Sequence, residues 1–282
     1  MAALRYLVEN SLVDGWDDPR LPTLSALRRR GYTPSSIFEF IRRAGIAKVD
    51  SLVDIELLEH CVREELNITA QRRICVIEPI KVVVDNFPEE KVEYFPIANN
   101  PMSAEAGIRN LPFTKELYIE SSDFSDNPPP KFFRMKPGAE VRLMGAYIVK
   151  CNEVIKNDDG SIKEIHCTAD LETGNGIPTD RKVKGTIHWV SATECTDISV
   201  VYYDKLFTHD NMNEIPTEEY NDYLNSNSAK VFDNCKAEAS IDYFGADNTF
   251  QFVRMGYFTR DTKHPDTFIR TVTLKDSFAK KN

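Results

Sequence analysis

The chain has 282 residues, of which 41% are hydrophobic and 28% are charged, so it can form two or three compact domains and is not disordered. Its formal net charge of -9 argues against a general nucleic-acid coat, which depends on a positive overall field, but is compatible with a structured RNA that meets a local basic face. No stretch approaches the roughly eighteen apolar residues of a membrane span and no apolar signal region is present, so we expect a cytoplasmic protein that does not bind a membrane.

The first thirty residues predict two short helices separated by a rigid turn. A helix is expected over residues 4–8, where apolar side chains recur at helical spacing. Pro19 and Pro22 hold the residues before them in an extended conformation, which makes the turn. Thr23 can cap a second short helix, which stops at Gly31.

Two longer helices follow. Thr33 and Pro34 form a cap followed by a proline at the first helical position, and the helix that they begin is expected to end at Gly45. A further helix is expected over residues 53–66, because apolar side chains form a stripe along it. Together these patterns predict a small helical domain over residues 1–72.

From residue 73 onward the hydrophobic pattern changes from helical to alternating, which predicts strands. The predicted strands cover residues 74–77, 81–85, 91–97, 117–120, 141–154, 162–171, 183–192, 198–207, 249–259 and 268–276. Their spacing is typical of β-barrels, with a hairpin turn at 157–160 and a helix over 217–224. Residues 121–130 and 171–180 are expected to be exposed loops. The predicted fold class is therefore mainly β with an N-terminal helical domain.

The sequence contains no recognisable catalytic machinery. It has no G-x-x-x-x-G-K-[ST] loop, and Gly174-x-Gly176 lacks the third glycine of a dinucleotide site. The histidines have no metal spacing, and the six cysteines are scattered without a CxxC pair, which predicts reduced thiols. The adjacent carboxylates Asp17 and Asp18 point apart on most backbones, so turn-capping explains them best. We therefore expect no catalytic residue, no metal and no cofactor in this chain.

Three consecutive arginines, Arg28, Arg29 and Arg30, lie at the end of the second predicted helix. One interpretation is that they only interact favourably with the helix dipole. The other is that their guanidinium groups bind phosphate oxygens, for which arginine is well suited. Both interpretations stay open at this point.

The stretches Gly-Trp-Asp-Asp-Pro-Arg-Leu-Pro-Thr (15–23) and Leu-Arg-Arg-Arg-Gly-Tyr-Thr (27–33) resemble the region just downstream of the active-site signature in glutaminyl-tRNA synthetases. Glutamyl enzymes of the archaeal and eukaryotic type have a similar turn, but the triple arginine resembles the glutamine enzymes more closely. Bacterial glutamyl enzymes are less similar, since their anticodon domain is helical. The resemblance implies two β-barrels of the glutaminyl-tRNA synthetase anticodon-binding type over residues 73–282, although periodicity cannot assign strands to either barrel.

Residues 181–190, Arg-Lys-Val-Lys-Gly-Thr-Ile-His-Trp-Val, resemble a stretch of that family in which the loop leading into it meets the first anticodon base. The resemblance implies that Arg181 and Lys182 bind tRNA. The alternative is an ordinary edge strand that lysines protect from pairing with other chains.

Residues 107–113 and 250–252 resemble the family segments whose arginine and glutamine contact the middle anticodon base, which implies that role for Arg109 and Gln251. An arginine fork and an amide suit the edges of splayed-out bases. Arg109 could instead form a surface ion pair, and Gln251 is expected on the solvent face of its strand in either case. The family also implies that Lys81 approaches the inside of the tRNA, although a lone lysine usually only adds solubility.

The resemblance implies the tRNA-binding part of a class I ligase whose full-length form attaches glutamine to its tRNA with ATP and Mg²⁺. The active-site signature and the Rossmann domain are not in this sequence, so we expect a catalytically inactive fragment that binds glutamine tRNA as a monomer. Two alternatives stay open. One is a standalone RNA-binding module, and the other is the equivalent part of an archaeal or eukaryotic-type glutamyl-tRNA synthetase.

Overall fold

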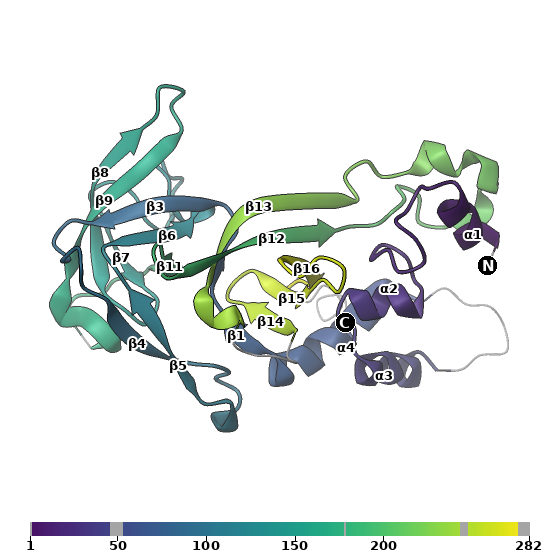
Figure 1. Cartoon of the computed structure of the whole chain (residues 1–282), viewed down its shortest axis with the longest axis horizontal. Coiled ribbons are helices and arrows are strands. Elements are labelled where there is room, and N and C mark those ends of the chain that lie inside the picture. The colour runs from purple at the N-terminus through teal and green to yellow at the C-terminus, as the bar shows by residue number, and fades with distance from the viewer. Residues whose placement is uncertain (1, 46–52, 178, 243–247, 276–282) are drawn as a thin grey trace. The chain divides into compact units, whose positions relative to one another are not determined.

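The computed structural model describes residues 2–45, 53–177, 179–242 and 248–275. The chain divides into two compact units (Figure 1). The first unit contains residues 1–70, 199–231 and 248–282, and the second contains residues 71–198 and 232–247. The fold is mostly β, with two nearly closed barrels and few helices, which confirms the predicted fold class.

The α-helices of the first unit begin and end close to the positions that the sequence predicts. They are α1 (Ala2–Glu9), α2 (Leu24–Arg29), α3 (Pro34–Ala44) and α4 (Ile55–Thr69). The Thr23 hydroxyl accepts a hydrogen bond from the Ala26 amide at 3.1 Å, and the Thr33 hydroxyl accepts one from the Ser36 amide at 3.2 Å. Each cap therefore occupies an amide that would otherwise lack a partner in the first helical turn. The predicted caps of α2 and α3 are confirmed.

Gly31 follows the end of α2, and this position requires glycine for two reasons. Its φ angle of +87° lies in the left-handed region, which glycine adopts without strain. A Cβ atom at this position would also lie 1.9 Å from the Thr259 hydroxyl oxygen. Glycine is therefore required both by the turn and by the close approach of a strand from the same unit.

The strands of the first unit follow the order β14-β15-β16-β12, of which β12 belongs to this unit from residue 199 onward. Their bounds are β12 (Cys195–Tyr203), β14 (Thr249–Phe252), β15 (Gly256–Arg260) and β16 (Thr267–Val272). Neighbours along this order are antiparallel except β16 and β12, which run parallel. Helix α4 packs its buried side chains Leu58, Val62 and Leu66 into one core with Tyr257 of β15 and Val272 of β16, so the helices and these strands share a core.

The second unit contains one sheet with the order β10-β7-β8-β9-β3-β6-β11 and a two-stranded ribbon of β4 and β5. Its strands are β1 (Gln71–Arg73), β2 (Cys75–Val76), β3 (Pro79–Val84), β4 (Glu93–Ala98), β5 (Ile108–Phe113), β6 (Glu116–Glu120), β7 (Glu140–Leu143), β8 (Ile148–Lys156), β9 (Ile162–Asp170), β10 (Thr186–Ile187) and β11 (Trp189–Ser191). Phe113 makes edge-to-face contacts with Phe87, Phe95, Tyr147 and Trp189, which form an aromatic core. The end of β13 (Ala229–Glu238) pairs with β2.

Three predicted strands are wrong as single strands. Residues 141–154 form β7 and β8, because Gly145 makes a turn with φ of +69°. Residues 249–259 form β14 and β15, which turn at Arg254, two residues before Gly256. Residues 183–192 break into β10 and β11 at the buried His188, because the two halves pair with different strands. The last predicted strand extends to residue 276, which lies outside the described residues.

Other elements were missed or mistaken. Strand β5 contains Pro112, and β13 is polar and largely exposed over its first half, so neither shows clear alternation. Residues 217–223 form a 3₁₀ helix rather than the predicted α-helix. The predicted loops also contain short 3₁₀ turns, over Ser121–Asp123 and Leu171–Gly176, in which Asp123 and Thr173 are buried. The remaining 3₁₀ helices are Ala104–Ala106, Met212–Glu214 and Ala239–Asp242. The hairpin turn over 157–160 is confirmed.

Candidate nucleic-acid interface

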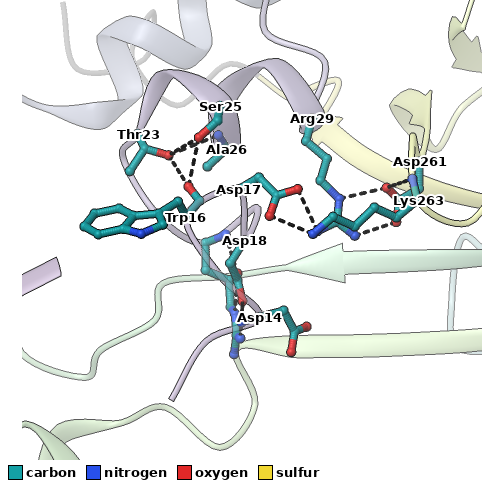
Figure 2. A network of polar contacts seen from close by, with 11 residues as sticks. Asp14, Trp16, Asp17, Asp18, Thr23, Ser25, Ala26, Arg29, Asp261 and Lys263 are labelled. Carbon is teal, nitrogen blue, oxygen red and sulfur yellow. Dashed lines mark hydrogen bonds and ion pairs between the residues drawn. The ribbon is translucent and has the colours of Figure 1, made fainter. Parts of the chain in front are cut away.

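The turn between α1 and α2 is held by carboxylates (Figure 2). Asp18 is 1% exposed and accepts hydrogen bonds from the amides of Asp14 and Arg20, both at 2.9 Å, and from the Arg20 guanidinium. Burial acts to raise the pKa of Asp18, but the hydrogen bonds from Arg20 and the two amides outweigh it and hold the pKa below its usual range. The turn-capping prediction is confirmed for Asp18.

Arg28 and Arg29 lie in α2 and Arg30 caps its end, and the three side chains have different environments. Arg28 is exposed, and its side chain forms no hydrogen bond or ion pair within the part of the chain that the structure describes. Arg30 is half-buried, with its guanidinium 5.8 Å from the centre of the Tyr32 ring and a long hydrogen bond to the Tyr203 carbonyl. Both leave donors that a phosphate can use, because a guanidinium has five N–H groups.

Arg29 differs from the expectation of a phosphate contact. It is 6% exposed, and its Nε and Nη2 atoms donate to the two carboxylate oxygens of Asp261 at 2.8 and 2.7 Å. A second carboxylate, that of Asp17, lies 3.8 Å from Nη1 and also accepts a hydrogen bond from Lys263 at 2.7 Å. Figure 2 shows Arg29 between the two aspartates. Its guanidinium therefore links the N-terminal turn to the loop between β15 and β16.

Arg109 lies on β5 in a buried ion pair rather than on an open surface. It is 9% exposed, and its Nε and Nη2 atoms donate to the Glu238 carboxylate at 2.5 and 2.8 Å. Its Nη1 atom donates to the Ala98 carbonyl at 3.0 Å. Glu238 lies 129 residues further along the chain, and no motif singles it out in the sequence.

Gln251 lies on β14 between two fully buried phenylalanines, Phe250 and Phe252. Side chains alternate between the faces of a strand, so Gln251 lies on the opposite face, where it is half-buried. The amide is therefore on the more open side of its strand, as the alternation predicts.

Arg181 and Lys182 are exposed residues on the segment that precedes β10, and they line a cleft of about 320 Å³ together with Arg142 and Thr179. Arg181 donates to Glu140 at 3.0 Å and to Asp170. Residues 181–185, the basic half of the stretch 181–190, do not form a strand, so Arg181 and Lys182 do not protect a sheet edge. Arg142, which sequence reasoning did not select, donates to the carbonyl of Thr173 at 3.1 Å.

Lys81 lies on β3 between two acidic neighbours and is 31% exposed at the side chain. Its Nζ atom is 2.5 Å from Glu116 and 4.0 Å from Glu164. The hydrogen bond to Glu116 raises the pKa of Lys81, so this lysine stays cationic at neutral pH.

Over residues 2–45, 53–177, 179–242 and 248–275, no three His, Cys, Asp or Glu side chains come together as a metal site. Within the same ranges, no helix is long and apolar enough to cross a membrane.

Three family models match the chain in succession. The anticodon-binding domain models of the class I tRNA synthetases for glutamate and glutamine match residues 70–170 and 186–261. The catalytic-domain model of the same synthetases matches residues 3–68. The chain belongs to the class I glutamyl- and glutaminyl-tRNA synthetase family. Residues 3–68 thus resemble part of the catalytic-domain model, and residues 70–170 and 186–261 resemble the anticodon-binding models.

Curated relatives in the synthetase family are similar over nearly the whole chain. The glutamine–tRNA ligase of Bradyrhizobium diazoefficiens is 45% identical over 284 residues, and that of Clostridium perfringens is 47% identical over 282 residues. Each alignment covers 98% of this chain and 50% of the relative. The chain therefore spans about half the length of the curated relatives that it matches.

Proposed function

We propose that this chain is the anticodon-reading, tRNA-binding part of a glutamine–tRNA ligase. One observation carries the proposal: two anticodon-binding models match residues 70–170 and 186–261 of a chain that is 45% and 47% identical to two glutamine–tRNA ligases. The partner is a glutamine tRNA. The protein acts in the cytoplasm, and this chain binds its tRNA as a monomer.

The middle base of a glutamine anticodon is uracil, because both glutamine codons have adenine in second place. Uracil offers carbonyl oxygens as acceptors and its N3–H as a donor, and an unstacked loop base exposes both to side chains. Arg109 supplies donors, and the Gln251 amide supplies both a donor and an acceptor. These two side chains therefore have the chemistry to recognise this base, and we assign the middle position to them.

Arg181 and Lys182 are assigned to the first anticodon base. They are exposed on an irregular segment beside a cleft of about 320 Å³, which can accept a base that has left its stack. Arg28, Arg30 and Lys81 are assigned to phosphate groups, since contacts to phosphate position an RNA without reading its sequence. Arg29 is left out of this set because it is 6% exposed and Asp261 already binds its guanidinium, whereas the Lys81 side chain is 31% exposed beside Glu116.

The full-length enzyme attaches glutamine to its tRNA and uses ATP with Mg²⁺. The residues described here supply the binding of the tRNA, and no group among them is arranged for catalysis. We therefore expect the purified chain to bind glutamine tRNA but not to catalyse glutamine-dependent exchange of pyrophosphate into ATP.

The test is equilibrium binding to transcripts of the glutamine and glutamate tRNAs of Clostridium perfringens, with pyrophosphate exchange measured on the same preparation. Tighter binding of the glutamine transcript and no exchange above the blank support the proposal. Tighter binding of the glutamate transcript would instead support a glutamyl-tRNA synthetase. Equal binding of unrelated RNAs would support a general RNA-binding module, and clear exchange activity would contradict the assignment of an inactive fragment.

A further inference from the structure

The Glu238 carboxylate is the centre of a buried cluster at the end of β13. Glu238 is 2% exposed, and both of its oxygens accept hydrogen bonds from Arg109. One of these oxygens also accepts from the Ile74 amide at 2.9 Å, and the other lies 3.7 Å from Nε of Arg73 and accepts a hydrogen bond from Ser240. All of these residues belong to the second unit.

The arrangement leaves part of the Arg109 guanidinium available. A guanidinium has five N–H groups. Two donate to Glu238 and one donates to the Ala98 carbonyl, so two N–H groups remain, one on Nη1 and one on Nη2. Two donors on neighbouring nitrogens of a planar group form a fork that can bind acceptors on a base edge.

The charges in the cluster do not cancel. Arg109 and Arg73 carry two positive charges, and Glu238 carries one negative charge, so these three side chains keep a net charge of about +1 at neutral pH. Without the carboxylate, two arginine side chains that are both nearly buried would repel each other, and the long Arg109 side chain would have no fixed partner for its Nε and Nη2 atoms.

We propose that Glu238 is the positioning residue that holds the Arg109 fork in the orientation that reads the middle anticodon base. This inference rests on the function proposed above for Arg109. Glu238 does not contact the base itself. It fixes the plane and direction of the guanidinium through two hydrogen bonds, so that the free N–H groups of Arg109 are pre-organised when the tRNA binds.

The test compares Glu238→Gln with Glu120→Gln in the full chain. Both glutamates are almost fully buried and both bind backbone amides, since Glu120 accepts from the amides of Ile77 and Glu78 at 2.9 and 3.0 Å. Glu120 is therefore a matched control for the loss of a buried carboxylate that does not hold Arg109. The probes are the Clostridium perfringens glutamine tRNA transcript and its variant with cytosine as the middle anticodon base, in which an amino donor replaces the O4 acceptor of uracil.

We expect Glu238→Gln to lower the preference for uracil over cytosine by at least about fivefold, the lower end of what one bidentate contact contributes. Glu120→Gln should leave this preference unchanged. The double variant Arg109→Ala with Glu238→Gln should match Arg109→Ala alone, because a residue that acts only through Arg109 has no effect once Arg109 is removed. Glu238→Asp keeps the charge but shortens the side chain, so it should also lower the preference, and it serves if Glu238→Gln does not fold.

The outcomes separate this inference from the function on which it rests. If Arg109→Ala loses the preference but both Glu238 variants keep it, or increase it, the positioning role is wrong and the anticodon assignment stands. If Arg109→Ala itself keeps the preference, both are wrong. If Glu120→Gln loses the preference as strongly as Glu238→Gln, the effect is a general loss of structure, and the positioning role is also refuted.

Discussion

Replacing Arg29 by methionine should strongly destabilise the first unit, although its neighbour Arg28 can be replaced almost without cost. The substitution keeps an unbranched apolar side chain but removes the guanidinium and its charge from between Asp261 and Asp17. Asp261 is 4% exposed, so its carboxylate would stay buried, with the Lys263 amide at 3.1 Å as its one remaining hydrogen-bond donor among the described residues.

The expected cost is about 3–5 kcal/mol, the range for breaking a buried ion pair by removing one partner. That is a large share of the roughly 5–15 kcal/mol by which a domain is stable. Arg28→Met removes an exposed charge with no partner in the described part of the chain, so its effect should stay within about 0.5 kcal/mol.

The stability that Arg29→Met removes should depend on pH. Burial acts to raise the pKa of Asp261, but the hydrogen bonds from Arg29 outweigh it and hold the pKa below its usual range. A depressed carboxylate pKa adds stability above the unfolded value near 4, and this contribution disappears as pH falls through the folded pKa. The difference between the wild-type chain and Arg29→Met should therefore be largest at neutral pH and shrink below about pH 4.

Hydrogen exchange measured peptide by peptide is the suitable assay, because it follows the two units separately. Peptides of α2, β15 and β16 should lose protection in Arg29→Met, whereas peptides of β7, β8 and β9 should not change. The double variant Arg29→Met with Asp261→Asn should recover part of the loss, since it removes the uncompensated charge. The reasoning is refuted if Arg28→Met and Arg29→Met change protection equally, or if the double variant is the least stable of all.

Three further predictions concern binding and the fold. Binding of glutamine tRNA should weaken as the salt concentration rises, despite the net charge of -9. Each phosphate contact should add roughly -0.7 to -0.9 to the slope of log K against log salt concentration, and a slope near zero in filter binding would contradict this. Arg109→Ala and Gln251→Ala should each lower the binding free energy by about 1–3 kcal/mol for the tRNA with the native anticodon, but by much less for a tRNA with a substituted middle base. Arg28→Ala should weaken the binding of both tRNAs equally. Equal profiles for Arg109→Ala and Arg28→Ala in competition binding would exclude a base contact by Arg109. Gly31→Ala should destabilise the first unit by about 2 kcal/mol or more in urea unfolding, because φ at this position is +87° and the added Cβ would collide with Thr259. An unchanged unfolding midpoint would contradict the described packing.

The sequence alone determined the features that depend on neighbours a few residues away. Thr33, Pro34 and Gly45 set the ends of α3 within one residue of the prediction, because capping and helix termination involve only the adjacent turn. The alternation of apolar side chains likewise established that the chain beyond residue 73 is mainly β. It did not show where strands break, since the one glycine beside the turn at Arg254, Gly256, interrupts an otherwise strand-like run only at its far side. The break at His188 arises from pairing with two different strands.

Only the tertiary structure decided what each charged side chain does. Consecutive residues of a helix point about 100° apart, so three arginines in a row cannot all face one partner, and the sequence does not say which of them is buried. Arg29 shares the buried face of α2 with Ala26, three residues earlier, and meets Asp261, which lies 232 residues away in sequence. Arg109 meets Glu238 across 129 residues in the same way. Ion pairs of this kind form when segments distant in sequence become neighbours, and no local pattern indicates them.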